Sequence, residues 1–412
     1  MPGMSVLKER TLRILAADDS AVMRGIMRNL FAAHAENRSS ELPRMELCGV
    51  ARDGVECLEA VKELRPDVLV LDLEMPRLNG LEVLERLRQE SLELPVIMCS
   101  SYTEHGARST LEALARGASD YVMKPSAQRN LDEALQSLSR QLLAKIAALA
   151  KGESRRERGV HERDEVAKSL RARSSEGRTR PNAPIEVVVI GLSTGGPSAL
   201  EQMLPKLPAD FPVPVLIVQH MPKLFTGALA ERLDKCCALR VEEAYDGAIV
   251  RRGTVWLAPG DSHMEVAPRR MNFGEGSGGV AVRSGRVRLH HQEPLNHCRP
   301  SVDYLFHSAA RMYGAGALGL MMTGMGADGL DGARAIHEKG GVVLAQDEAT
   351  SAVWGMPGRV TDAGIANATL PLRMLAGELE QWVNAGRIVK PEAAIHTASA
   401  PTSRREVIHG LY

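Results

Sequence analysis

The first half of the chain alternates short apolar runs with longer stretches of helical periodicity. Apolar runs that predict buried strands cover residues 12–17, 45–50, 68–71, 95–99 and 121–123. Between them lie amphipathic stretches such as residues 80–90, in which Leu81, Leu84 and Leu87 fall on one helical face. Continuous apolar strands that alternate with helices predict a parallel sheet covered by helices on both faces.

The second half repeats this alternation after a change of character. Residues 131–149 have a long helical pattern, whereas residues 151–180 carry more basic than acidic side chains and few apolar ones. Such a segment cannot form a core, so we expect a charged tether that is mobile or partly helical. Further strands are predicted at residues 185–190, 213–218, 254–258, 318–322 and 341–344. The sequence therefore predicts an α/β protein with two parallel-sheet domains.

These patterns also predict where the domains begin and end. The expected segments are a first domain at 10–145, a charged linker at 146–183, a second domain at 184–380 and a flexible tail at 388–412. Residues 272–286 are rich in glycine, which predicts a surface hairpin or loop.

Composition narrows the possible functions. Lys+Arg and Asp+Glu number 51 each, which argues against nucleic-acid binding by bulk charge but leaves a local basic patch open. Aromatic residues make up 3% of the chain, too few for a base-stacking platform. The six cysteines have no metal-site or disulfide spacing, so we interpret them as free thiols. Because the N-terminus lacks a secretory signal and no apolar stretch could span a bilayer, we expect a cytoplasmic protein without membrane insertion.

Acidic residues follow two of the predicted strands in the first domain. Asp18 and Asp19 end one strand and Asp72 ends another, at the sheet edge where parallel α/β folds bind ligands. Three converging carboxylates require a cation, and an all-oxygen cluster suits Mg²⁺. Ser100 and Lys124 end two further strands and offer the hydroxyl and ammonium that a phosphoryl group would need. Any one of these residues alone could be a strand-end cap or a surface charge, but together they favour a phosphate site.

The order of these residues resembles the receiver domain of response regulators, a family with a flavodoxin-like fold. The matching segments are Asp18-Asp19, residues 71–76, 78–80 and 117–121, Ser100-Ser101 and Lys124-Pro125. The resemblance implies that Asp72 accepts a phosphoryl group and that Asp18, Asp19 and Asp72 hold Mg²⁺. It implies switch residues, which are Ser100, Tyr121 and Lys124, and a cis peptide bond at Lys124-Pro125. A degenerate receiver that no longer accepts phosphate is the alternative, and the intact aspartates count against it.

A glycine-rich turn opens the second domain. Residues 190–196 read Ile-Gly-Leu-Ser-Thr-Gly-Gly, and they follow a predicted strand and precede a helix that has Pro197 near its start. A serine on such a turn, here Ser193, projects its hydroxyl at the top of a sheet beside unpaired helix N–H groups. Turns of this kind also bind phosphate or nucleotides. On this motif alone, hydrolysis and phosphate binding remain equally good interpretations.

Two further strand ends favour hydrolysis. His220 directly follows the strand at 213–218, and a histidine beside a strand-end serine is a suitable general base. Asp328 lies in a glycine-rich segment after the strand at 318–322 and could orient the imidazole. Taken singly, His220 could be structural, and Asp328 could be a turn or N-cap residue.

These elements resemble the Rossmann-like, doubly wound catalytic domain of chemotaxis protein-glutamate methylesterases over residues 184–375. Other matching segments are residues 258–264, 299–303, 345–347 and 356–357. The resemblance implies a Ser193–His220–Asp328 triad, with backbone N–H groups near His220 and Met325 as the oxyanion hole and no cofactor in this domain. The Gly-rich insertion at 272–286 and the long linker depart from the family pattern, which leaves loop structure and interdomain docking open.

The two resemblances together imply a phosphorylation-activated serine esterase for chemotactic adaptation. Its substrates would be glutamate methyl esters on methyl-accepting chemoreceptors, with receptor glutamines deamidated as a second activity. Its phosphodonor would be the chemotaxis histidine kinase, and no nucleic acid would be bound. One rival is a phosphorylation-switched docking protein without turnover, which an incomplete triad would have favoured. The other is a transcription factor, but the strand-rich second half offers no recognition helix.

Overall fold

Two parallel sheets organise the chain. The computed structural model describes residues 10–37, 41–125, 131–159, 183–268 and 285–385. The first sheet has the strand order β2-β1-β3-β4-β5, which is the flavodoxin-like order of doubly wound folds. Its strands are β1 Leu12–Ala17, β2 Met45–Ala51, β3 Val68–Asp72, β4 Val96–Ser100 and β5 Asp120–Met123.

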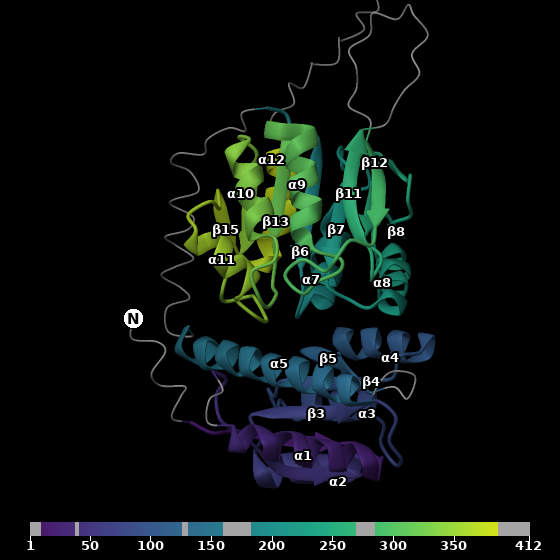
Figure 1. Cartoon of the computed structure of the whole chain (residues 1–412), viewed down its shortest axis with the longest axis vertical. Helices are drawn as coiled ribbons and strands as arrows, with labels where there is room; N and C mark the ends of the chain where they lie inside the picture. Colours follow the sequence, from purple (N-terminus) through teal and green to yellow (C-terminus); the bar gives the residue numbers. More distant parts are fainter. Residues whose placement is uncertain (1–9, 38–40, 126–130, 160–182, 269–284, 386–412) are drawn as a thin grey trace, which may run out of the picture.

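Helices cover both faces of this first sheet (Figure 1). They are α1 Ala21–Glu36, α2 Gly54–Leu64, α3 Gly80–Gln89, α4 Glu104–Ala115 and α5 Leu131–Gly159. Local sequence sets their starts: Asn79 and Glu82 form a capping box at the beginning of α3, and Asp53 caps α2. The cores on the two sides of the sheet contain Leu71 and Val83 on one side and Phe31 and Ile146 on the other.

The second sheet has seven strands in the order β15-β14-β13-β6-β7-β10-β8, all paired in parallel. They are β6 Val187–Leu192, β7 Val215–Gln219, β8 Arg240–Glu243, β10 Thr254–Leu257, β13 Ala317–Met321, β14 Val342–Gln346 and β15 Ala368–Leu370. Strand β6 lies between β7 and β13, so the chain order reverses on either side of it. The carboxyl ends of strands at such a switch point form the ligand crevice of doubly wound folds.

Helices and a small second sheet surround this core. The helices are α7 Gly196–Met203, α8 Lys223–Cys236, α9 Val302–Tyr313, α10 Leu330–Glu338, α11 Met356–Asp362 and α12 Leu372–Ala385, with short 3-10 turns η2 Leu204–Lys206 and η3 Gly314–Gly316. An antiparallel three-stranded sheet, β11-β12-β9, is built from β9 Ile249–Val250, β11 His263–Pro268 and β12 Gly285–His290. The predicted parallel strands of both domains are present within one or two residues, whereas the short strands β8, β9, β11, β12 and β15 were not predicted.

The structure corrects the predicted linker. Helix α5 continues through Gly159 instead of ending near residue 149, and Ile146 and Ala150 in the expected linker are buried in the first domain. The apolar side chains of α5 therefore extend the core by one more turn than the charge pattern indicated. Residues 160–182, most of the Gly-rich insertion and the predicted tail lie outside the described residues.

A second correction concerns Lys124-Pro125. Among the described residues the cis peptide bond is Arg299-Pro300, and Lys124-Pro125 is trans. The Lys124 N–H donates to Ser100 O at 2.8 Å, so the backbone continues the extended course of β5 beyond the strand.

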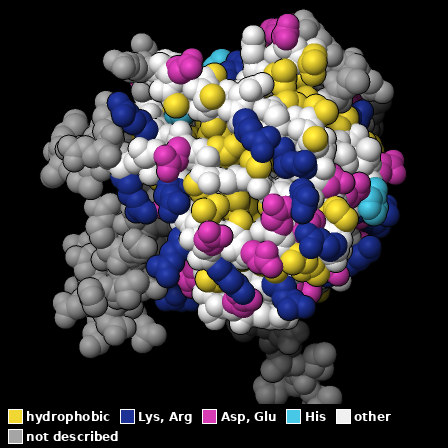
Figure 2. Space-filling view, turned by 90° about the horizontal axis from the view of Figure 1, so that it is seen from below, with side chains coloured by type: hydrophobic (Ala, Val, Ile, Leu, Met, Phe, Trp, Pro, Cys, Tyr) yellow, Lys and Arg dark blue, Asp and Glu magenta, His cyan; other side chains and the backbone are white. Residues whose placement is uncertain are grey.

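The two domains contact each other through α4, β5 and the end of α5 in the first domain (Figure 1). The Tyr121 ring stacks on Phe225 of α8 with centroids 4.8 Å apart, and the Ser198 hydroxyl donates to Leu114 O at 3.0 Å. Seen from the first domain's outer end, Figure 2 shows basic and acidic side chains interspersed with apolar ones, without one dominant charge. Within the described part of the chain, no helix is both long and apolar enough to cross a bilayer.

Candidate active site and phosphoacceptor site

The three residues expected to act together lie at adjacent strand ends of the second sheet. Ser193 follows β6, His220 follows β7, and Asp328 lies in the segment after β13. Leu192 pairs with Gln219 in the β6–β7 register, so the next residues, Ser193 and His220, leave neighbouring strands at the same level. The fold thus brings together positions that are distant in the sequence.

The turn after Ser193 depends on glycine. Gly195 has φ 77°, a left-handed conformation, and a Cβ on Gly196 would lie 1.9 Å from Gln219 Oε1. The buried Gln219 amide donates to Ser193 O at 2.9 Å and to His220 O at 3.2 Å. This side chain therefore fixes the two strand ends relative to each other, a role that its position beside His220 did not reveal.

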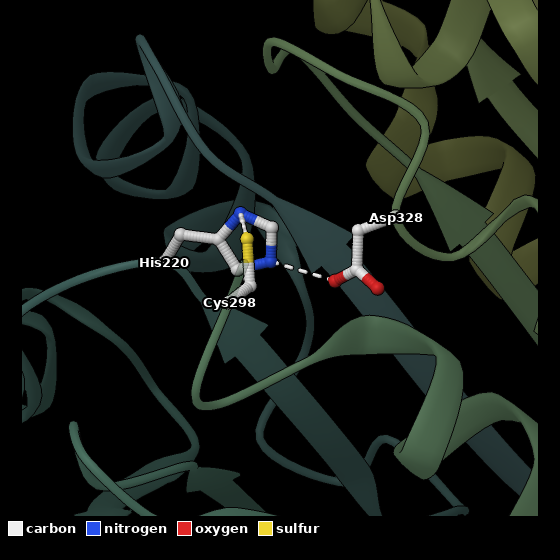
Figure 3. Close-up of side chains that lie close together, drawn as sticks. All are labelled: His220, Cys298 and Asp328. Carbon is white, nitrogen blue, oxygen red and sulfur yellow. Dashed lines mark hydrogen bonds and ion pairs between the residues drawn. The ribbon is translucent and has the colours of Figure 1, made fainter. Parts of the chain in front are cut away.

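His220 and Asp328 form a direct pair. His220 Nε2 and Asp328 Oδ2 are 2.8 Å apart, and Figure 3 shows the carboxylate at that edge of the ring. Burial alone would lower the pKa of His220, but the hydrogen bonds and charges of Asp328 and Cys298 together outweigh burial and raise it. Burial would likewise raise the pKa of Asp328, but its hydrogen bonds, first of all with His220, lower it. The pair therefore favours imidazolium beside carboxylate, which strengthens His220 as a base.

Cys298 is a neighbour that the sequence did not indicate. Its Sγ lies 3.6 Å from His220 Nδ1, and Figure 3 shows the sulfur over the imidazole ring. Ligand atoms of His220, Cys298 and Asp328 lie within 4.8 Å of one another. A metal ion there would occupy an imidazole nitrogen that a base requires, so we interpret the group as a triad fragment with a packed thiol.

The expected hydrogen bond between Ser193 and His220 stays a prediction. Within the described ranges, the contacts of Ser193 are made by its backbone: its N–H donates to Thr323 O at 3.0 Å and its carbonyl accepts from Gly196 N at 2.8 Å. A Cβ on Gly324 would lie 2.9 Å from Ser193 Cβ, so glycine keeps space beside the hydroxyl. Catalytic hydrogen bonds are often completed only when substrate binds.

One oxyanion-hole residue needs correction. The His220 N–H donates to Leu192 O at 3.2 Å, because it continues the β6–β7 pairing, and it is therefore not free to bind an oxyanion. No described residue accepts a hydrogen bond from the Met325 N–H, and the Met325 side chain is partly exposed. Met325 accordingly stays a prediction.

The acidic residues of the first domain converge as expected. Carboxylate oxygens of Asp18, Asp19 and Asp72 lie within 4.8 Å of one another. The Lys124 ammonium is 3.0 Å from Asp18 Oδ2 and 2.7 Å from Asp72 Oδ2. Burial and the charge of Asp18 raise the pKa of Asp72 to about 6, although Lys124 opposes this. The three carboxylates carry more negative charge than the Lys124 ammonium can balance. Such a cluster fits a hard divalent cation such as Mg²⁺.

The surroundings of this cluster leave it accessible. A cavity of about 600 Å³ adjoins it and is lined by Asp19, Glu74 and His105, among others. Of the predicted switch residues, Lys124 reaches the carboxylates, whereas the buried Ser100 hydroxyl accepts from Thr110 Oγ1 at 2.7 Å on α4. Tyr121 is buried against the second domain.

Comparison with known proteins identifies both halves. Residues 14–136 match the response regulator receiver domain, and residues 188–379 match the CheB methylesterase family. A Trichodesmium erythraeum protein named protein-glutamate methylesterase/protein-glutamine glutaminase is 41% identical over 376 residues, which cover 89% of this chain and 97% of that protein. The chain belongs to the CheB methylesterase family.

The chain is also similar to a second relative and to two solved domain structures. A Thermotoga maritima protein with the same name is 37% identical over 379 residues, which cover 92% of this chain and all (100%) of that one. The crystal structure of the Thermotoga maritima CheB methylesterase catalytic domain is 38% identical, covers 48% of this chain and 98% of that one, and has a TM-score of 0.44. The response regulator domain of that CheB is 39% identical, covers 33% of this chain and 94% of that one, and has a TM-score of 0.28.

Proposed function

We propose that the protein is a phosphorylation-activated serine esterase that hydrolyses glutamate methyl esters on chemoreceptors. The observation that carries this proposal is the His220–Asp328 pair, 2.8 Å apart, at the strand end next to Ser193. Membership of the CheB methylesterase family supports the same substrate class, because the curated relatives are named for that activity.

The proposed mechanism uses the two imidazole nitrogens differently. Asp328 engages Nε2, so the Ser193 proton would pass to Nδ1, whose neighbour in the structure is Cys298 Sγ at 3.6 Å, as the hydroxyl attacks the ester carbonyl. His220 then returns that proton to the leaving methoxy group, and methanol departs. Water hydrolyses the acyl-enzyme, again with His220 as base, and this step releases a receptor glutamate and free Ser193. A glutamine side chain offers the same carbonyl with ammonia as leaving group, so deamidation would follow the same route.

The first domain would supply control. Asp18, Asp19 and Asp72 would hold Mg²⁺, whose chemistry when bound is to neutralise the phosphoryl oxygens. Asp72 would accept the phosphoryl group from a histidine kinase. Lys124, already paired with Asp72, would then gain a doubly charged partner.

Interdomain contacts support autoinhibition. The first domain packs against α7 and α8, which begin directly after Ser193 and His220 in the chain. Val353, in the segment after β14, belongs to the same apolar cluster as Leu149 and Ala150 of α5. The first domain therefore contacts elements that border the catalytic edge of the second sheet, where it would limit the approach of a receptor helix.

Replacing Tyr121 should release this inhibition. Tyr121→Ala removes the ring stacked on Phe225 and weakens the interface, so we expect several-fold higher methanol release from the unphosphorylated protein. Tyr102, which is 51% exposed, is a matched control, and Tyr102→Ala should leave the rate unchanged. Comparison with fragment 184–412 gives the rate without any first domain. Equal activity of the full chain, the fragment and both variants would reject autoinhibition.

Phosphorylation should require Asp72. Asp72→Asn keeps the shape of the side chain but removes the nucleophilic carboxylate, so a small phosphodonor with Mg²⁺ should no longer raise the rate of methanol release. We expect the basal, donor-independent rate to persist, because Asp72 belongs to the first domain. Stimulation of Asp72→Asn equal to that of the wild type would place the phosphoacceptor elsewhere.

The direct test of the proposed function is methanol release from a methylated receptor fragment by the full chain, with and without the phosphodonor. The expected result is turnover that the donor increases. Stoichiometric binding of the receptor without methanol release would instead support a docking protein.

A further inference from the structure

The segment 296–303 contains a sequence motif, Arg299 to Asp303, that the triad does not explain. In the structure this segment leads into α9 and lies against Asp328. The Asn296 amide donates to Asp328 Oδ1 at 3.1 Å, the Ser301 hydroxyl to the same oxygen at 2.6 Å, and the Val302 N–H to Oδ2 at 2.6 Å. With His220 on Oδ2, both carboxylate oxygens have two partners.

The Ser301 side chain does not make the hydrogen bond that is usual at its position in the chain. It is the N-cap residue of α9, with φ −110° and ψ 139°, but its side chain makes no cap hydrogen bond. An N-cap serine ordinarily accepts from a backbone N–H of the first helical turn. Here the Asp328 carboxylate, from a different segment, takes the Val302 N–H, and the Ser301 hydroxyl donates to Asp328 instead. The carboxylate thus also benefits from the positive end of a twelve-residue helix.

The backbone of Ser301 is held in place as well. Ser301 is fully buried, and its N–H donates to Nδ1 of His263, which is also fully buried. The other ring nitrogen of His263 lies 3.2 Å from Glu293 O, so that Nε2 carries the proton. Ser301 therefore has no solvent partner and its hydroxyl has one acceptor, Asp328.

We propose that Ser301 is a positioning residue that holds the Asp328 carboxylate toward His220, so that the working row is Ser193, His220, Asp328 and Ser301. Rotation of the carboxylate would break the bonds to Ser301 and Val302 together, so Oδ2 stays directed at the imidazole. The inference rests on the proposed hydrolytic function. It explains the motif at 299–303 as a segment that orients the Asp328 carboxylate for catalysis.

The first test compares two buried serines, Ser301 at the N-cap of α9 and Ser308 within α9. Ser301→Ala should lower kcat for methanol release about ten- to a hundredfold, as expected for losing a hydrogen bond to a charged group, with little change in KM. Ser308 is 1% exposed, and its hydroxyl accepts from Val266 N and donates to Leu305 O, away from Asp328. Ser308→Ala should therefore keep the wild-type kcat. Equal losses in the two variants would overturn the proposal.

A second test separates positioning from general support of the fold. If Ser301 acts through Asp328, Ser301→Ala should have at most a twofold effect in an Asp328→Ala background. The same loss in both backgrounds would contradict the proposal. Ser301→Cys replaces the hydroxyl with a slightly larger thiol that is a weaker donor, and it should give an intermediate kcat. This variant decides the question if Ser301→Ala fails to fold.

The effect of Ser301→Ala can also be measured without the ester substrate. The rate at which a fluorophosphonate labels Ser193, followed by mass spectrometry of the full chain, reports only whether the serine is activated. If the wild type labels at Ser193 but releases no methanol, the substrate assignment fails and the Ser301 test still stands. If labelling of the wild type is fast and Ser301→Ala labels equally fast, the positioning role fails instead.

Discussion

Replacing Ser193 with alanine is expected to reduce methanol release from a methylated receptor about 10⁶-fold, as removal of the nucleophile does in other serine hydrolases. Alanine lacks the oxygen that forms the acyl-enzyme. The side chain is small and the backbone of Ser193 is already bonded to Thr323 O and Gly196 N, so the fold should persist. The rate should be measured with phosphodonor present, so that the wild-type rate is at its highest and the whole decrease in the variant can be measured.

The same variant distinguishes nucleophile loss from weaker receptor binding. KM should be nearly unchanged, because the hydroxyl acts on the transition state. Ser308→Ala is the control for unspecific damage, because Ser308 is buried and its hydroxyl bonds to Val266 N and Leu305 O instead of a triad residue. Near-normal methanol release from Ser193→Ala would end the triad mechanism and return the glycine-rich turn to the phosphate-binding interpretation.

Replacing Asp328 with asparagine is expected to lower kcat about 10⁴-fold, the size of effect seen when a triad carboxylate becomes an amide. The amide cannot stabilise the imidazolium, and its NH₂ group would face the N–H of Val302 or the hydroxyl of Ser301 where an acceptor is needed. The loss should therefore exceed that of Ser301→Ala, which removes one of the four partners of the carboxylate.

The pH dependence of Asp328→Asn gives an independent check. His220 must be neutral to accept a proton, so activity falls as the pH drops through the pKa of His220. Because the hydrogen bond with Asp328 raises that pKa, the asparagine variant should move the acid limb of the kcat profile to lower pH. A limb that stays in place would mean that another group sets it.

The apolar and polar pattern was sufficient for the architecture. Buried runs such as Val68–Asp72 and Val187–Leu192 are strands because four to six consecutive apolar residues fit a sheet covered on both faces. The same pattern placed Ser193, His220 and Asp328 after separate strands, and parallel strands end at one edge. The predicted boundary at residue 145 was wrong, because Ile146 and Ala150 are buried and belong to the core of the first domain.

The amino-acid sequence by itself determined the strands, the acidic cluster with Lys124 and the strand-end positions of the triad, since each follows from local periodicity and from the direction of parallel strands. Only the tertiary structure decided that Cys298 lies over the imidazole, that the His220 N–H is used within the sheet, and that Ser301 donates to Asp328. These contacts join segments about 27 to 78 residues apart through loops with no periodic pattern. Their partners are chosen by packing and hydrogen-bond satisfaction in the folded protein, not by neighbours in the chain.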